Sequence, residues 1–143
     1  MKFSGLNILV TGGAGFIGSH VVDALIDKGS RACVIDNLVN GRLENLSRHK
    51  SGKSFSFKRG DINDGSFLER AMKGVDVVFH MACLGVRHSI KDPLENHRVN
   101  AEGTLNVLRS ARKNKVRRFV YCSSSEVYGT ARSVPMKESH PTY

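Results

Sequence analysis

The sequence predicts an α/β fold of the Rossmann type: a doubly wound parallel sheet with helices on both faces. Short apolar runs rich in β-branched residues alternate along the chain with longer segments of helical period. One of the turns between a strand and a helix is a cluster of glycines. Strands that are apolar throughout are covered on both faces, and right-handed crossovers between them leave few other topologies.

The first half of the chain supplies three of the expected strands. Residues 6–11 form an apolar run that ends in the glycine cluster, and Gly29 stops the helical period that follows. Asp36 closes the second strand. The expected elements are a strand at 6–11, a helix at 16–28, a strand at 32–35, a short helix at 42–49 and a strand at 55–58.

The second half continues the alternation. Gly74 stops one helix, and Pro93 opens a long one whose apolar side is expected to carry Leu94, Val99, Leu105 and Leu108. The expected elements are helices at 66–72 and 93–111 and strands at 75–81 and 116–122. After Ser123 the chain becomes polar and turn-like.

Length and composition are those of one globular domain. The chain has 143 residues, of which 40% are hydrophobic and 24% charged. Its apolar runs are shorter than the roughly 18–20 residues of a membrane span, and the first residues lack the pattern of a signal peptide. We therefore expect a cytoplasmic protein that does not bind membranes.

The formal net charge is +9, and the basic residues are densest between residues 109 and 118. That segment lies where a helix is expected to end, and cations are favoured at a helix C-terminus. No aromatic residues are interleaved with the charges, as a stacking surface for single strands would require. A solvated helix end is therefore favoured over a nucleic-acid site.

The three cysteines, Cys33, Cys83 and Cys122, are widely spaced within or beside apolar runs. They are expected to be reduced, buried thiols. No spacing of Cys and His residues suits a metal, so no metal site is expected.

The glycine cluster Gly12-Gly13-Ala14-Gly15-Phe16-Ile17-Gly18 indicates a dinucleotide site, because it joins a strand to a helix. Glycine permits the sharp turn and a close approach of the backbone to a pyrophosphate, which the free N–H groups of the helix N-terminus bind. Asp36 lies 18 positions past Gly18, where a carboxylate accepts hydrogen bonds from the adenosine ribose. Since that carboxylate repels a 2′-phosphate, NAD is favoured over NADP.

The segment TGGAGFIGSH, followed by Asp36-Asn37-Leu38, resembles the extended short-chain dehydrogenase/reductases, and most closely their NAD-dependent nucleotide-sugar epimerases and dehydratases. The resemblance covers essentially the whole chain but only the first half of a typical member. It implies cofactor contacts from Gly12, Gly15, Phe16, Ile17, Gly18, Asp36 and Asn37.

Further segments carry the resemblance. Gly60-Asp61-Ile62 follows the third expected strand, and the resemblance places Asp61 and Ile62 on the adenine ring; without it, Asp61 suits a turn or a helix cap. His80-Met81-Ala82-Cys83 ends the fourth, where Met81 and Ala82 are implied to line the cofactor pocket. His80 itself is expected to be a buried, hydrogen-bonded histidine.

The helix from Pro93 contains the family's VNxxGTxNVL pattern. The resemblance places Asn100 near the nicotinamide. Gly103, inside a helix, indicates a close approach by a neighbour, because glycine otherwise costs roughly 1 kcal/mol there.

The segment Ser123-Ser124-Ser125-Glu126-Val127-Tyr128-Gly129 leaves the fifth expected strand at the edge where open α/β sheets bind ligands. It resembles the family's catalytic segment, and the resemblance makes Ser124 the catalytic hydroxyl. Glu126 is the second catalytic candidate, because dehydratases and uronic acid decarboxylases carry a glutamate there whereas epimerases commonly do not. Ser125 stands where a dehydratase typically has an acid. Without the resemblance, the segment suits a serine-rich turn.

The family's Tyr-x-x-x-Lys pair does not occur in this sequence. We expect the catalytic tyrosine beyond the last residue, with Tyr143 as the less favoured alternative, and the sugar-binding lobe to be absent. The favoured function is the NAD-binding half of a 4-epimerase that forms a transient 4-keto sugar from a nucleotide sugar. We expect this substrate to be a UDP-sugar and the complete enzyme to be a homodimer. The alternatives are a 4,6-dehydratase, a uronic acid decarboxylase, a keto-reductase or a non-catalytic NAD-binding module.

Overall fold

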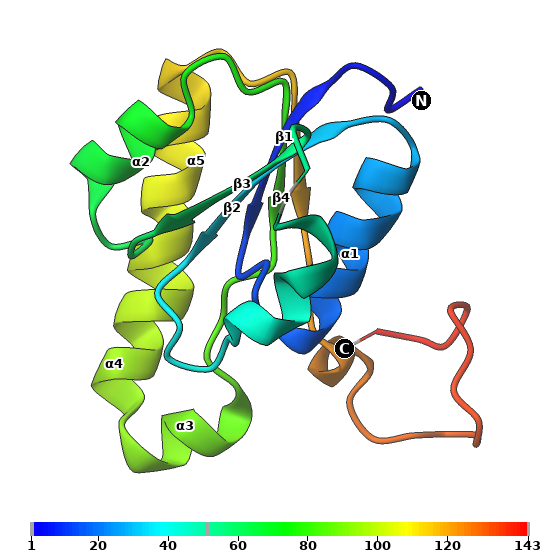
Figure 1. Cartoon of the computed structure of the whole chain (residues 1–143). Helices are drawn as coiled ribbons and strands as arrows, with labels where there is room; N and C mark the ends of the chain where they lie inside the picture. Colours follow the sequence, from blue (N-terminus) through cyan, green and yellow to red (C-terminus); the bar gives the residue numbers. More distant parts are fainter. Residues whose placement is uncertain (1, 51, 143) are drawn as a thin grey trace.

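The computed structural model describes residues 2–50 and 52–142, so Tyr143, the alternative position for the catalytic tyrosine, lies outside the described residues. Within them a parallel sheet has the strand order β3-β2-β1-β4-β5 (Figure 1). The strands are β1 (Asn7–Thr11), β2 (Arg31–Asp36), β3 (Phe55–Arg59), β4 (Val77–His80) and β5 (Arg118–Tyr121). Because the order reverses between β1 and β4, the sheet is doubly wound, and the predicted fold class is confirmed.

Helices cover both faces of this sheet. In Figure 1, α1 lies on one side and α2 and α5 lie on the other. The helical elements are α1 (Phe16–Asp27), the 3₁₀ segment η1 (Leu43–His49), α2 (Gly65–Ala71), α3 (Val86–Lys91), α4 (Pro93–His97), the π segment η2 (Arg98–Gly103), α5 (Thr104–Lys113) and the 3₁₀ segment η3 (Ser125–Tyr128).

The alternation of side chains along the strands divides the core into two clusters. Ile8 and Val10 of β1 pack with Val22 and Leu25 of α1, whereas Leu9, between them, packs on the opposite face with the helices α2 and α5. Each face of the sheet is therefore buried under its own helices, as the continuous apolar strands predicted.

The chain from Pro93 to Lys113 is helical, as expected, but it contains the π segment η2. The hydrogen bonds of a π turn span one residue more than those of an α turn, which shifts the phase of the helix, so the predicted apolar side is wrong in part. Leu94, Leu105 and Leu108 are 81%, 52% and 43% exposed, and α5 instead buries Val107, Ser110 and Ala111. Val99 does pack against the core.

The expectation that all three thiols are buried is also wrong. Cys33, within β2, is half-buried, but Cys83 and Cys122 are exposed. Both follow the last residue of a strand, β4 and β5 respectively, and so lie at the carboxyl edge of the sheet rather than inside it. All three are free thiols.

The basic cluster lies at the end of α5 and the start of β5, where a helix end was expected. Two of its cations form ion pairs, Lys113 with Glu69 at 2.7 Å and Arg117 with Asp76 at 2.6 Å. None of the helices in residues 2–50 and 52–142 has the length and apolar character to cross a membrane.

Candidate functional site

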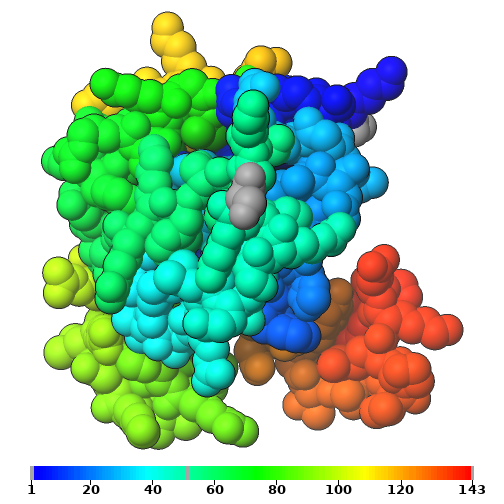
Figure 2. All heavy atoms as spheres, viewed as in Figure 1, coloured from blue at the N-terminus to red at the C-terminus, as the bar shows by residue number. Residues whose placement is uncertain are grey.

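A cleft of about 1050 Å³ opens at the carboxyl edge of the sheet, where the strand order reverses. This edge is the lower end of the molecule in Figure 2, which is hollowed between the yellow-green segment and the orange one. The cleft brings together all but one of the residues singled out in the sequence: Gly12, Gly15, Phe16, Ile17, Gly18, Asp36, Asn37, Asp61, Ile62, Met81, Ala82, Asn100 and Ser124. Glu126 is not among its lining residues.

The glycine turn is as tight as its sequence requires. Gly12 has φ 68°, and a Cβ there would come within 2.7 Å of the Ala82 backbone. A Cβ on Gly18 would overlap the Gly12 carbonyl oxygen. α1 then begins after Gly15 with neither a side-chain cap nor an acidic residue in its first turn. Its first N–H groups therefore face the cleft as an anion site.

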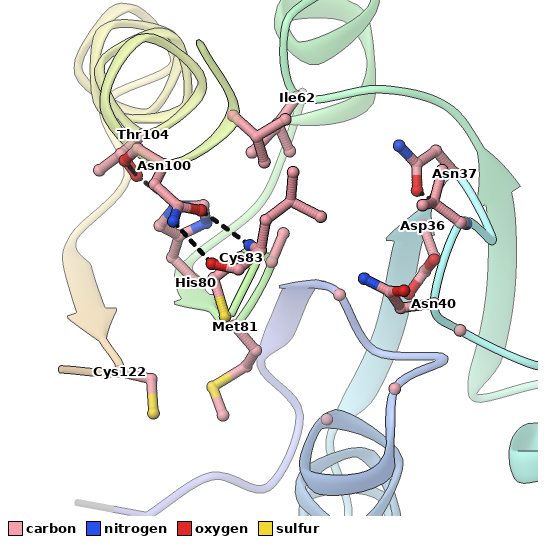
Figure 3. Close-up of a pocket in the computed structure, with 18 of the residues that line it drawn as sticks. Asp36, Asn37, Asn40, Ile62, His80, Met81, Cys83, Asn100, Thr104 and Cys122 are labelled. Carbon is pink, nitrogen blue, oxygen red and sulfur yellow. Dashed lines mark hydrogen bonds between the residues drawn. The ribbon is translucent and has the colours of Figure 1, made fainter. Parts of the chain in front are cut away.

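Asp36 lies beside this turn at the end of β2 and is only 8% exposed. Its Oδ2 accepts a hydrogen bond from the Ala14 N–H at 3.0 Å, and its Oδ1 accepts one from the Leu38 N–H at 2.8 Å. A carboxylate has about four acceptor sites, so it keeps capacity for hydroxyl donors from the cleft. Asp36 thus both holds the glycine turn and faces the cleft (Figure 3).

A second carboxylate lies next to it. The Asn37 amide donates to Asp61 Oδ2 at 3.1 Å, and the Asn63 N–H donates to Asp61 Oδ1 at 2.8 Å. Asp61 is therefore a turn residue, while Asp64 caps α2 by accepting from the Phe67 N–H at 2.9 Å. These hydrogen bonds hold the polar side chains of this loop in place at the rim of the cleft.

Ile62 explains the glycine inside the helix. A Cβ on Gly103 would lie 2.6 Å from Ile62 Cδ1, so the loop after β3 packs directly on the backbone of η2. The close approach expected at Gly103 is confirmed, and the neighbour is a side chain that lines the cleft.

The opposite end of the cleft is built on His80 and Asn100 (Figure 3). His80 is 1% exposed and is hydrogen-bonded through both ring nitrogens, as the sequence predicted. Burial lowers the pKa of its imidazole to about 4. The Asn100 amide pairs with the backbone of Leu84: Oδ1 accepts from its N–H and Nδ2 donates to its carbonyl, both at 2.8 Å.

The two catalytic candidates are separated by the structure. Ser124 lines the cleft, and its Oγ accepts a hydrogen bond from the Glu126 N–H at 3.2 Å, which caps η3. Glu126 is exposed within η3. Cys83 and Cys122 lie at the same end as Ser124, and partial desolvation of the Cys83 sulfur, together with the neighbouring Cys122, raises the pKa of the Cys83 thiol.

Sequence reasoning missed several parts of the lining, and two of them are loop segments outside the expected elements. The first is the loop Val39, Asn40 and Gly41; a Cβ on Gly41 would come within 2.7 Å of Asp36 Oδ1. The second is the chain after Cys83, where Leu84, Gly85 and Val86 lead into the unpredicted helix α3. The first carried a detectable signal, since Asn-Gly so soon after Asp36 marks a tight turn.

Comparison with known proteins assigns the family. The profile of the family described as GDP-mannose 4,6 dehydratase matches residues 9–143. The chain therefore belongs to this family, which lies among the nucleotide-sugar epimerases and dehydratases of the extended short-chain dehydrogenase/reductases. The resemblance stated from its motifs is confirmed, and the family is one of enzymes.

Individual relatives come from three kinds of enzyme within it. UDP-glucuronic acid decarboxylase 2 of Arabidopsis thaliana is 39% identical over 141 residues, which are 98% of this chain and 30% of the relative. UDP-glucose 4-epimerase of Erwinia amylovora is 39% identical, over 95% of this chain and 42% of its own length. The structure of dTDP-glucose 4,6-dehydratase from Streptomyces venezuelae, which has NAD bound, superposes with a TM-score of 0.87 at 36% identity and covers 96% of this chain and 45% of its own. The chain thus spans less than half the length of each.

Proposed function

We propose that this chain binds NAD in the cleft and is the cofactor-binding part of a nucleotide-sugar 4-epimerase. One observation carries the proposal: the uncapped N-terminus of α1 and the Asp36 carboxylate face the same cleft, at the point where the strand order reverses. Dinucleotides bind Rossmann folds at this place, with the pyrophosphate on the helix and an acidic residue on the ribose. The NAD bound to the related dehydratase supports the choice of cofactor.

The residues present fit this cofactor from end to end. The adenosine half would lie over β1 to β3, with the ribose on Asp36 and the adenine beside Asn37, Asp61 and Ile62. The pyrophosphate would lie on the backbone of residues 12–18, where the missing Cβ atoms leave room for it. The nicotinamide half would lie over β4 and β5, beside Met81, Ala82 and Asn100.

NAD in this position would supply a hydride acceptor and donor. Ser124 is the residue of this chain that we propose to act on the sugar. Because its Oγ already accepts from the Glu126 N–H, its own proton is free to donate toward the cleft. We propose that this hydroxyl holds the sugar oxygen from which a proton is removed, and that it stabilises the charge that develops there.

We propose further that the 143 residues alone bind the cofactor without turning over a nucleotide sugar. No Tyr-x-x-x-Lys pair occurs in them, so they lack the family's base. We also propose that these residues form one NAD-binding domain. A UDP-sugar substrate, a homodimer and a cytoplasmic location belong to the complete enzyme and remain predictions.

The position of Glu126 favours an epimerase over a dehydratase or a decarboxylase. A residue that handles a proton or a carboxylate of the sugar has to face the substrate, whereas Glu126 is exposed and does not line the cleft. In an active enzyme that contains these residues, Ser124→Ala should lower kcat by about 100-fold or more, while Glu126→Gln should change it only a few fold. Complete loss of turnover in Glu126→Gln would instead identify the dehydratase or decarboxylase.

The cofactor itself is tested by calorimetric titration of the chain with NAD and with NADP. We expect the wild type to bind NAD at least about tenfold more tightly, because the Asp36 carboxylate repels a 2′-phosphate. Asp36→Asn should lose this preference. Asp27→Asn, an exposed aspartate of α1, is the matched control and should keep it. Equal affinity of the wild type for both nucleotides would contradict the assignment.

A further inference from the structure

Two threonine hydroxyls flank the buried ring of His80. The Thr11 Oγ1 lies 2.6 Å from His80 Nδ1, and the Thr104 Oγ1 lies 2.9 Å from His80 Nε2. Thr11 is the last residue of β1, His80 is the last of β4, and Thr104 is the first of α5. The imidazole thus joins three elements that meet beneath the cleft.

The donor and acceptor of each hydrogen bond in this chain follow from the bond between Thr104 and Asn100. The Thr104 hydroxyl donates to the Asn100 carbonyl at 2.7 Å, and a carbonyl can only accept. Having one proton, Thr104 must accept from His80, so Nε2 carries the hydrogen. In a neutral ring Nδ1 is then an acceptor and takes the Thr11 proton. The tautomer is assigned from the network.

Both ends of the chain reach backbone that shapes the cleft. At one end, Thr11 Oγ1 accepts from the N–H groups of Met81 and Ala82 at 3.3 and 3.4 Å. At the other end, Thr104 fixes the carbonyl of Asn100, whose side chain holds Leu84 through two hydrogen bonds. Met81, Ala82, Leu84 and Asn100 all line the same end of the cleft.

We propose that His80, as the neutral Nε2–H tautomer, is a positioning residue that sets the shape of the nicotinamide half of the cleft through Thr11 and Thr104. The inference rests on the proposed NAD binding and deepens it. His80 acts through the two threonines, and the adenosine half, held by Asp36 and the glycine turn, does not depend on it.

This arrangement requires the ring to stay uncharged. An imidazolium carries hydrogens on both nitrogens, so Nδ1 could no longer accept from Thr11. The ring is 1% exposed and packs near the rings of Phe119 and Tyr121, with centroid distances of 5.9 and 5.8 Å, and this burial disfavours a charge. The lowered pKa of the imidazole agrees with that environment.

The first test separates the two halves of the ligand. His80→Phe keeps the packing of a ring but removes both hydrogen bonds, and calorimetry compares its affinity for NAD with its affinity for ADP, which lacks the nicotinamide riboside. We expect the affinity for NAD to fall by about tenfold and that for ADP to stay within about twofold. His49→Phe removes another buried, hydrogen-bonded histidine, bound to Asp23 at 2.6 Å outside the cleft, and should change neither.

The second test restores the two hydrogen bonds of the His80 ring one at a time. His80→Asn offers an acceptor near the position of Nδ1, and His80→Gln offers an amide N–H near that of Nε2. Because Thr104 leads to Asn100, we expect His80→Gln to recover more of the NAD affinity than His80→Asn. The wild-type tautomer is read independently by ¹⁵N NMR of the histidine rings at pH 7, which needs no variant to fold.

The outcomes distinguish this inference from the proposed function. A wild type that binds neither NAD nor ADP would overturn the NAD site itself. A wild type that binds both, with His80→Phe weakening both equally or neither, would overturn the role of His80 alone. A protonated Nδ1 in the NMR spectrum would overturn the assigned directions of the two hydrogen bonds of His80, whatever the titrations give.

Discussion

At the scale of single residues, the site depends on side chains that serve the fold and the cleft together. The Asp36 carboxylate binds the Ala14 N–H of the glycine turn while it faces the cleft. The Asn100 amide is engaged with Leu84 and Asn96, so it shapes the loop at the end of the cleft that we propose for the nicotinamide. Such dual roles explain why a short motif specifies both the turn and the ligand.

The buried neutral His80 makes stability depend on pH in a defined direction. Its pKa in the folded chain is about 4, below the ordinary value of 6.5, so the unfolded chain binds the proton more tightly. This contribution to stability is complete above pH 6.5 and is lost as the pH falls through 4. Between pH 7.5 and 5 we expect a loss of ~2 kcal/mol from this group.

The measurement is urea unfolding of the wild type and of His80→Phe at the two pH values. The variant should be less stable at pH 7.5, but its free energy of unfolding should fall by ~2 kcal/mol less on acidification, because it lacks the titrating group. Parallel pH profiles for the two proteins would mean that His80 is not held neutral.

At the scale of elements, the strands and most helices follow from their apolar patterns, and a glycine or aspartate marks the end of several of them, such as Gly29 after α1, Asp36 in β2 and Gly74 after α2. The π segment η2 and the helix α3 do not. η2 depends on a long-range contact, the packing of Ile62 against Gly103, which the local sequence does not reveal. α3 has six residues and buries none of them, so it carries no apolar period.

The site, too, has parts that the local sequence predicts and parts that it does not. The glycine turn, Asp36 and Ser124 were predictable because motif residues follow strands, whose carboxyl ends meet at one edge. The exposure of Cys83 and Cys122 was not, since their neighbours in sequence are apolar strand residues. The placement of Glu126 outside the cleft was also beyond the sequence, because it depends on the turn of η3 that Ser124 caps.

The glycine turn predicts opposite effects for two glycine substitutions. A Cβ on Gly18 would overlap backbone atoms of the turn, whereas a Cβ on Gly65, the first residue of α2, would meet nothing within 4 Å. Gly18→Ala should therefore lower the free energy of unfolding by about 2 kcal/mol or more. Gly65→Ala should raise it by about 0.5 kcal/mol, because alanine loses less entropy on folding.

Thermal unfolding of both variants at pH 7.5 checks this prediction. Since the Gly18 contact is with backbone, little relaxation is available to relieve it. A Gly18→Ala variant as stable as the wild type would show that the turn is looser than the close approach to Gly12 indicates.

At the scale of the whole molecule, the cleft and the densest group of basic residues lie at opposite edges of the sheet. The cleft occupies the carboxyl edge, and the basic segment between Arg109 and Arg118 lies where α5 ends and β5 begins, at the other edge (Figure 1). In a chain with a net charge of +9, the basic segment could attract a pyrophosphate as well as the cleft does. The fold predicts that the uncapped end of α1, and not the basic segment, holds it.

Binding of NAD across this cleft can be followed residue by residue in ¹H–¹⁵N NMR spectra of the chain during titration with NAD. We predict saturable shifts of the Phe16, Ile17 and Gly18 amides, together with those of Leu38 and Leu84 at the two ends of the cleft. The amides of residues 109–118 should not move. Shifts confined to that basic segment, with the glycine turn unchanged, would rule out NAD binding in the cleft.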